Sequence, residues 1–86
     1  MKLKAHREFL KDYKSLPPNV QKQLNYKLKL LSEDPSHPSL RSERLRGSPG
    51  ICASSINMQY RFTWEYSGYD VIVLRRCGDH DVLDKP

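Results

Sequence analysis

Residues 52–66 read CASSINMQYRFTWEY, and residues 71–80 read VIVLRRCGDH. In the first stretch apolar and polar residues alternate, and the large side chains of Phe62 and Trp64 stand two positions apart. Side chains in a β-strand point alternately to the two faces of a sheet. We therefore predict a strand over residues 52–66, with an apolar row on one face and hydrogen-bonding groups, including Arg61, on the other.

A turn at Ser67-Gly68 separates this strand from a second run of strand-forming residues that starts at Val71. The two strands then form a hairpin and run antiparallel. In that arrangement Arg76 lies back toward Arg61 rather than away from it. Arg75 and Arg76 are neighbours in the chain, so alternation predicts that they point to opposite faces and that only one of them joins Arg61.

The residues before this stretch predict an edge strand and two helices. Residues 2–5 alternate between polar and apolar, whereas residues 7–16 and 18–33 carry apolar residues at the spacing of amphipathic helices. Asp12 is expected on the exposed side of the first helix. Pro17-Pro18 separates the helices, because proline lacks an N–H and its fixed φ suits the first turn of a helix. We expect an antiparallel αα-hairpin whose apolar face packs on the apolar row of the sheet.

Length and composition limit the protein to one domain, residues 1–86, with a modest core. The net charge of +5 favours a polyanionic partner such as nucleic acid. No apolar run is long enough for a membrane helix and no signal-peptide pattern is present, so we expect a cytoplasmic protein without a membrane partner. Cys52 and Cys77 are expected to be reduced, and a disulfide requires that their strands are adjacent and in register.

Residues 40–46 read LRSERLR and follow a loop that contains two prolines. We predict that this segment is extended and that Arg41, Arg44 and Arg46 face the phosphates of RNA. The alternative is an ordinary solvated loop, because runs of charge are usually exposed to water for solubility alone.

Arg61, Arg76 and His80 are the candidate catalytic residues. A guanidinium held on a strand is a rigid fork of donors that suits a phosphate, although an ion pair with Glu65 or Glu43 is the alternative for Arg61. His80 lies between two aspartates, whose negative charges favour the protonated imidazole. RNA cleavage without a metal needs cationic donors for the charge on the phosphorane and an acid for the leaving 5′-oxygen. The convergence of these three side chains therefore predicts a nuclease.

A metal site is the weaker alternative. Cys77 and His80 have a spacing that occurs in zinc sites, and His37 or Cys52 could complete the set, but a second clustered pair is missing. The aspartates near the C-terminus do not form the spaced carboxylate cluster of a magnesium nuclease. Phosphate-binding and dinucleotide-binding motifs are absent as well, so the sequence predicts neither a metal nor a cofactor.

The order and spacing of these segments resemble the RelE/ParE superfamily of toxins from toxin–antitoxin pairs. The resemblance covers nearly the whole chain, and besides the first strand and a helix pair broken at Leu16-Pro17 it is carried by LLSEDP at 30–35, HPSL at 37–40, LRG at 45–47, SINMQYRF at 55–62 and GDHDVL at 78–83. It implies an α+β fold, in which the N-terminal strand and the αα-hairpin pack on a twisted, mainly antiparallel sheet.

The resemblance also implies an activity. It is that of a type II toxin: a ribosome-dependent, metal-independent mRNA endonuclease that cuts in the ribosomal A site, with the 2′-hydroxyl of the substrate as nucleophile. Arg61 matches the arginine of a Tyr-Arg motif that contacts the scissile phosphate. Arg76 and His80 match an Arg-x-Gly-x-His pattern of one branch, in which the histidine acts as an acid or base. The implied partners are a cognate antitoxin, in a hetero-oligomer, and mRNA with the ribosome; no cofactor is implied.

Two features depart from the family pattern. Ser55 stands where other branches have lysine or arginine, and the tail lacks the late catalytic tyrosine of several branches. Two other functions therefore stay open. One is inhibition of DNA gyrase, as in the ParE branch, where Arg61 and His80 would be scaffold. The other is that of a non-catalytic relative that binds RNA or a protein through its basic face.

Overall fold

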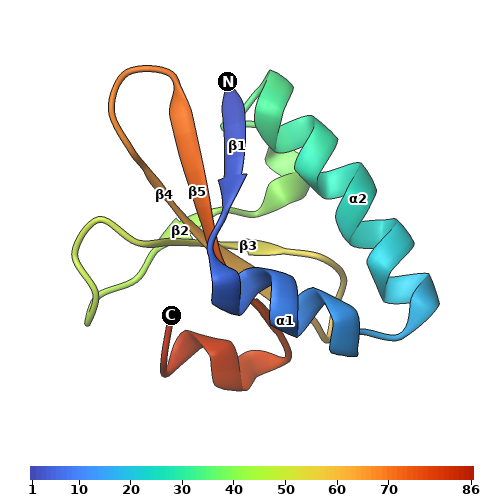
Figure 1. Ribbon diagram of the computed structural model, residues 1–86. Helices are drawn as coiled ribbons and strands as arrows, with labels where there is room; N and C mark the ends of the chain where they lie inside the picture. The colour runs from blue at the N-terminus through green and yellow to red at the C-terminus, as the bar shows by residue number, and fades with distance from the viewer.

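The computed structural model describes residues 1–86, which form a five-stranded sheet in the order β1-β5-β4-β3-β2 (Figure 1). The strands are β1 (Lys2–Ala5), β2 (Glu43–Arg44), β3 (Cys52–Ser55), β4 (Arg61–Tyr66) and β5 (Val71–Gly78). β1 and β5 are parallel, and the other neighbours are antiparallel. The N-terminal edge strand and the mainly antiparallel sheet predicted from the sequence are therefore confirmed.

Two helices follow β1, namely α1 (Arg7–Ser15) and α2 (Pro18–Glu33), and two short 3-10 helices are η1 (Pro38–Leu40) and η2 (His80–Leu83). The predicted break between the helices is confirmed, since Pro18 is the first residue of α2. The hydroxyl of Tyr13 donates to Asn25 Oδ1 at 2.8 Å and links the two helices. Neither helix has the length and apolar character needed to cross a membrane.

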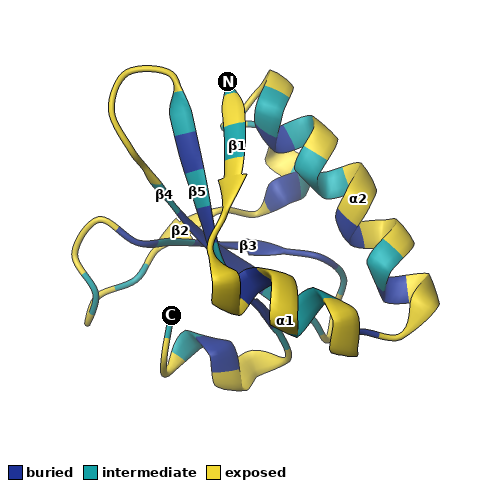
Figure 2. Cartoon of the chain, in the orientation of Figure 1, coloured by how far each residue is buried: buried dark blue, intermediate teal, exposed yellow.

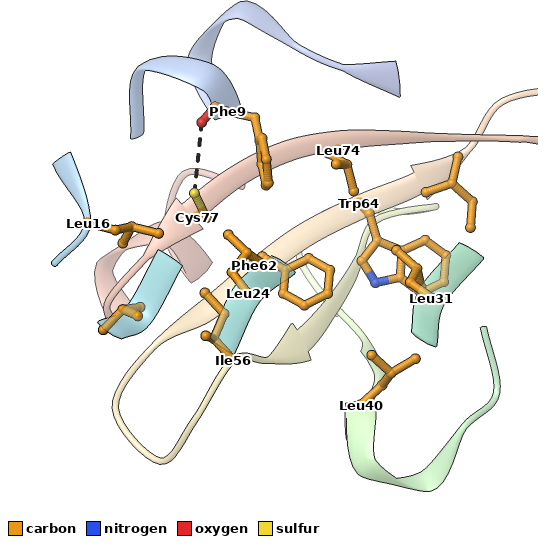
Figure 3. Packing of buried hydrophobic residues seen from close by; sticks show 12 residues of the cluster. Phe9, Leu16, Leu24, Leu31, Leu40, Ile56, Phe62, Trp64, Leu74 and Cys77 are labelled. Carbon is orange, nitrogen blue, oxygen red and sulfur yellow. Dashed lines mark hydrogen bonds between the residues drawn. The ribbon is translucent and has the colours of Figure 1, made fainter. Parts of the chain in front are cut away.

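The core lies between the helices and one face of the sheet (Figures 2 and 3). Phe9 from α1 and Leu24 and Leu31 from α2 pack against Phe62 and Trp64 of β4, and all five side chains are buried. The predicted packing of the helix pair on the apolar row is confirmed. Burying side chains of this size contributes about 1.5–3 kcal/mol each relative to leaving them exposed.

The prediction of a strand that runs through residues 52–66 is wrong. The chain turns at residues 56–60, where Asn57 Oδ1 accepts the N–H groups of Gln59 and Tyr60, both at 2.8 Å. In the resulting hairpin even-numbered residues of β3 pair with even-numbered residues of β4, for example Ser54 with Phe62. Apolar residues therefore stay on one face across the turn, and the alternation in the sequence continues as if the strand were unbroken.

The prediction that Arg75 and Arg76 point to opposite faces is also wrong. Arg76 pairs with Thr63, but Leu74 pairs with the next residue of β4, so that Arg75 is the extra residue of a β-bulge. The guanidinium of Arg75 donates to Glu65, which lies on the same face as Thr63, at 3.2 Å. The bulge therefore turns both arginines toward the polar face.

Two residues predicted in the apolar stripes of the helices are exposed. Leu10 in α1 keeps 52% of its surface accessible, and Tyr26 in α2 keeps 61%. Both lie beside the stripe rather than within it, because the sheet covers only the narrow faces centred on Phe9 and Leu24.

Cys52 and Cys77 are both free, as predicted. Their strands, β3 and β5, are separated by β4. Cys77 is buried, and its thiol donates to the carbonyl of Phe9 at 3.8 Å (Figure 3). Cys52 is only half-buried, and burial raises the pKa of its thiol.

Stability should fall at alkaline pH because of Cys77. Burial, with a further contribution from Asp12, raises the pKa of this thiol from 9.0 to about 12. The native state keeps the proton while the unfolded chain loses it, so the stabilisation is complete below pH 9.0 and is lost as the pH rises toward about 12. Urea unfolding between pH about 8 and about 10.5 tests this. Cys77→Ala should lose less stability over that range, and an equal loss in both proteins would show that another group titrates.

Candidate functional site

The candidate site lies where β4 and β5 pair, on the face of the sheet opposite the main core; η2 covers part of this face, and Asp12 of α1 reaches it. Arg61 is paired with Gly78, and Thr63 with Arg76. Paired residues of an antiparallel ladder point to the same face, and long side chains reach their diagonal neighbours. The register thus places Arg76 diagonally across from Arg61.

Arg61 is partly exposed and forms no hydrogen bond or ion pair through its side chain; the ion pairs of the structure involve other groups. Of the two alternative partners, Glu65 pairs with Arg75 instead and Glu43 forms no ion pair. The guanidinium of Arg61 is therefore free to bind an anion from outside the chain.

Arg76 is held in place by α1. Its Nε donates to Asp12 Oδ2 at 2.6 Å and its Nη2 to Asp12 Oδ1 at 3.3 Å, and this hydrogen-bonded pair raises the pKa of Arg76. The N–H of Cys77 donates to the same carboxylate at 3.2 Å, and Arg76 Nη1 donates to the carbonyl of Lys85 at 3.4 Å. Arg76 is thus a fixed donor whose charge is largely balanced, whereas the charge of Arg61 is not.

The expectation that Asp12 is exposed is wrong, because its side chain is only 16% accessible. Asp12 follows Phe9 by three residues and precedes Leu16 by four, so it lies on the buried stripe of α1. A carboxylate at that spacing was the signal of a partly buried ion pair. Its charge instead grouped Asp12 with Lys11 and Lys14 on the exposed side of the predicted helix.

Gly78 lets η2 fold back under the end of β5. Its φ is 158°, and a Cβ at this position would approach Val82 Cγ1 to 3.0 Å. Since Gly78 and Arg61 share a face, Val82 and η2 lie on that face as well. His80 is exposed at the start of η2, two residues beyond Gly78. Two residues span at most about 7 Å, so His80 and Arg61 lie at the same end of the sheet.

The arginines of residues 41–46 are exposed but do not form one surface with Arg61. Arg44 pairs with Cys52, whose side chain packs against the core on the helix side of the sheet, so Arg44 faces away from Arg61. Arg41 follows η1, and Arg46 lies in the turn after β2. Their role in RNA binding stays a prediction.

Ser55, at the position where a cation was expected, has a structural role. Its hydroxyl donates to the carbonyl of Asn57 at 2.8 Å, and the residue is buried. The turn between β3 and β4 is therefore tied together at this position, and of the three arginines on the polar face Arg61 is the one without a partner.

A pocket of about 590 Å³ opens between the end of α1, β5 and η2. Arg76 and Gly78 line it together with Tyr60, which precedes β4. No three His, Cys, Asp or Glu side chains come together in a way that could hold a metal ion. The lining of the pocket also includes the carboxylates of Asp12, Asp79, Asp81 and Asp84, and neither Arg61 nor His80 lines it.

The fold is that of the RelE/ParE toxins. The YoeB/ParE toxin from Agrobacterium tumefaciens is 20% identical, with a TM-score of 0.81 over 93% of this chain and 99% of that one. A chain of the intact E. coli RelBE toxin–antitoxin complex is 24% identical, with a TM-score of 0.73 over 91% and 94%. A chain of the E. coli DinJ-YafQ toxin–antitoxin complex is 20% identical, with a TM-score of 0.72 over 95% and 94%. No family model and no curated protein matches the sequence.

Proposed function

We propose that this chain is the toxin of a type II toxin–antitoxin pair and that it cleaves mRNA on the ribosome without a metal. The shared fold supports the first part. The observation that carries the second is the free guanidinium of Arg61 on the polar face of the sheet, with Arg76 diagonally across and His80 two residues beyond the glycine opposite Arg61.

In the proposed reaction the 2′-hydroxyl of the RNA gives up its proton to solvent and its oxygen attacks the adjacent phosphorus, and the bond from phosphorus to the 5′-oxygen breaks. Arg61 binds the scissile phosphate and stabilises the charge that grows on the phosphorane. Arg76 supplies a second donor, which Asp12 holds in a fixed direction. The protonated imidazole of His80 gives its proton to the departing 5′-oxygen. The products are a 2′,3′-cyclic phosphate and a 5′-hydroxyl end.

The proposal includes an antitoxin that binds this chain in a hetero-oligomer in the cytoplasm. Two of the similar structures are toxin–antitoxin complexes. The net charge of +5 suits an acidic segment of the antitoxin, and complementary charge speeds association. Such a segment would lie over the cations of the polar face and block access of RNA.

Expression of the wild type and of His80→Gln from a tightly controlled promoter tests the proposal. The wild type should arrest growth and yield cleaved mRNA in a ribosome-containing assay, with or without a chelator. His80→Gln should lower the cleavage rate about 10²–10⁴-fold, the usual contribution of general acid catalysis, and relieve the arrest. Gln is polar and His80 is exposed, so folding should not change.

Two outcomes would contradict the proposed nuclease activity and support another function. Growth arrest by both proteins without mRNA cleavage, together with inhibited DNA supercoiling, would indicate a gyrase inhibitor of the ParE kind. Normal growth with the wild type, in a strain that lacks any antitoxin, would indicate a non-catalytic relative that binds RNA or a protein.

A further inference from the structure

A second polar pocket lies beside η1. Its volume is about 360 Å³. Only polar residues and two prolines line it, namely Pro35, Ser36, His37, Pro38, Arg41 and Ser42. None of the residues of the candidate catalytic site contributes to it. Its position, between the end of α2 and the start of β2, makes it a separate site.

One cation, Arg41, lines this pocket, and a second, Lys27, lies next to the segment that forms it; neither has a carboxylate partner. Lys27 of α2 donates from Nζ to the carbonyl of Ser39 at 2.7 Å, which brings its ammonium group to the segment that carries Arg41. Burial and the charge of Arg41 both lower the pKa of Lys27. Neither side chain takes part in any of the ion pairs of the structure. An anion bound between them would relieve their mutual repulsion.

Arg41 holds a backbone conformation that costs free energy. It is the one non-glycine residue with positive φ, at φ 49° and ψ 46°, and its N–H donates to the carbonyl of Pro38 at 3.1 Å. L-residues with side chains rarely adopt this left-handed region, and such strain concentrates at functional sites. Glycine or asparagine would fit the backbone better, yet the position carries a guanidinium.

His37 and the neighbouring serines add neutral donors. The N–H of Ser39 donates to His37 Nδ1 at 3.1 Å, so the neutral imidazole carries its proton on Nε2. The nearest carboxylate, that of Asp34, does not line the pocket and accepts the N–H and hydroxyl of Ser36 at 3.1 and 3.2 Å. The lining therefore presents donors and positive charge to a ligand.

We propose that this pocket binds a phosphate group of RNA other than the one that is cleaved. The guanidinium of Arg41 and the imidazole N–H of His37 match a tetrahedral oxyanion, which accepts hydrogen bonds in several directions. The identity of the polymer rests on the proposed function, but binding of phosphate can be measured on its own. In this role Arg41 anchors the RNA away from Arg61, and the nearby charge of Lys27 strengthens the attraction.

The test is a titration of the isotopically labelled full chain with inorganic phosphate, followed by NMR against sodium chloride of equal ionic strength. Saturable shifts are expected at residues 36–42 and at the ring of His37. Arg41→Gly should keep the fold, because glycine accepts the left-handed conformation, and should weaken phosphate binding at least about tenfold, the effect of losing one charge-assisted contact. Lys27→Met, which keeps the apolar stem, should do the same.

Arg7→Gln is the matched control, since it removes an exposed arginine of α1 that lies outside the pocket and forms no ion pair. If it weakens phosphate binding as much as Arg41→Gly, only diffuse electrostatic attraction exists and the site is refuted. A short single-stranded RNA should displace inorganic phosphate from residues 36–42. Displacement by a glutamate-rich peptide of equal charge, but not by RNA, would overturn the assignment to RNA and point to the antitoxin. If the wild type binds phosphate at this pocket but does not cleave mRNA, the proposed function is refuted and the phosphate site is not.

Discussion

Replacing Arg61 by alanine should lower the rate of ribosome-dependent mRNA cleavage at least about 100-fold, the usual effect of removing one donor that stabilises a transition-state charge. The effect should be large because Arg61 has no partner within the chain and because Arg76, its diagonal neighbour, already shares its charge with Asp12. For the same reason the thermal midpoint should change little, since no internal contact is lost. Single-turnover cleavage of an mRNA on the ribosome, with thermal unfolding of the same samples, measures both quantities.

Lys22→Ala controls for the loss of one positive charge, because Lys22 is an exposed cation of α2 far in sequence from the candidate site. The cleavage rate of this variant should stay within about threefold of the wild-type rate, as expected for a screened surface charge at physiological salt. A rate for Arg61→Ala within the same range would exclude Arg61 from the reaction, and with it the main support for a nuclease.

Replacing Asp12 by alanine should remove about 1.5–3 kcal/mol of stability, the range for losing a hydrogen bond to a charged group. The change leaves the guanidinium of Arg76 and the N–H of Cys77 without their acceptor, and both groups are at most partly exposed. Asp12→Asn retains one acceptor oxygen, so it should lose less stability than Asp12→Ala. Urea unfolding at neutral pH gives the free energies. Cleavage by Asp12→Asn should also fall, because Arg76 is no longer held in a fixed direction.

Glu33→Ala is the matched control for Asp12, since Glu33 is an exposed carboxylate at the end of α2 without an ion pair. Its effect should stay within about 0.5 kcal/mol. Equal losses for the two alanine variants would mean that the contact with Arg76 contributes nothing to stability.

The helices were predictable because their physical causes are local. Pro18 starts α2, and the apolar spacing that buries Leu24 and Leu31 is visible in the sequence. The edge strand and the hairpin between β4 and β5 were predictable for the same reason, since Gly68 takes a positive φ of 78° in the turn. These elements follow from turn chemistry and periodicity within a few residues.

The turn at Asn57 and the bulge at Arg75 could not be predicted from local sequence patterns. The hairpin of β3 and β4 pairs even with even residues, so the alternation continues across the turn. A bulge depends on the register of two strands, which no single strand encodes. The contact of Asp12 with Arg76 joins residues 64 positions apart, and only its helical spacing hinted at it. The roles of Arg61, Arg76 and His80 stay predictions.

The extra residue at Arg75 also affects how this chain is compared with others. A homologue whose β5 pairs regularly would have one residue fewer there, so a correct alignment needs a single gap at this position and no compensating change elsewhere. Without that gap, residues before the bulge are matched one position out of step with those after it. Sequence comparison alone would then align Arg75 with the position that pairs with Thr63, which Arg76 occupies in this structure. The wrong arginine would be assigned to the site.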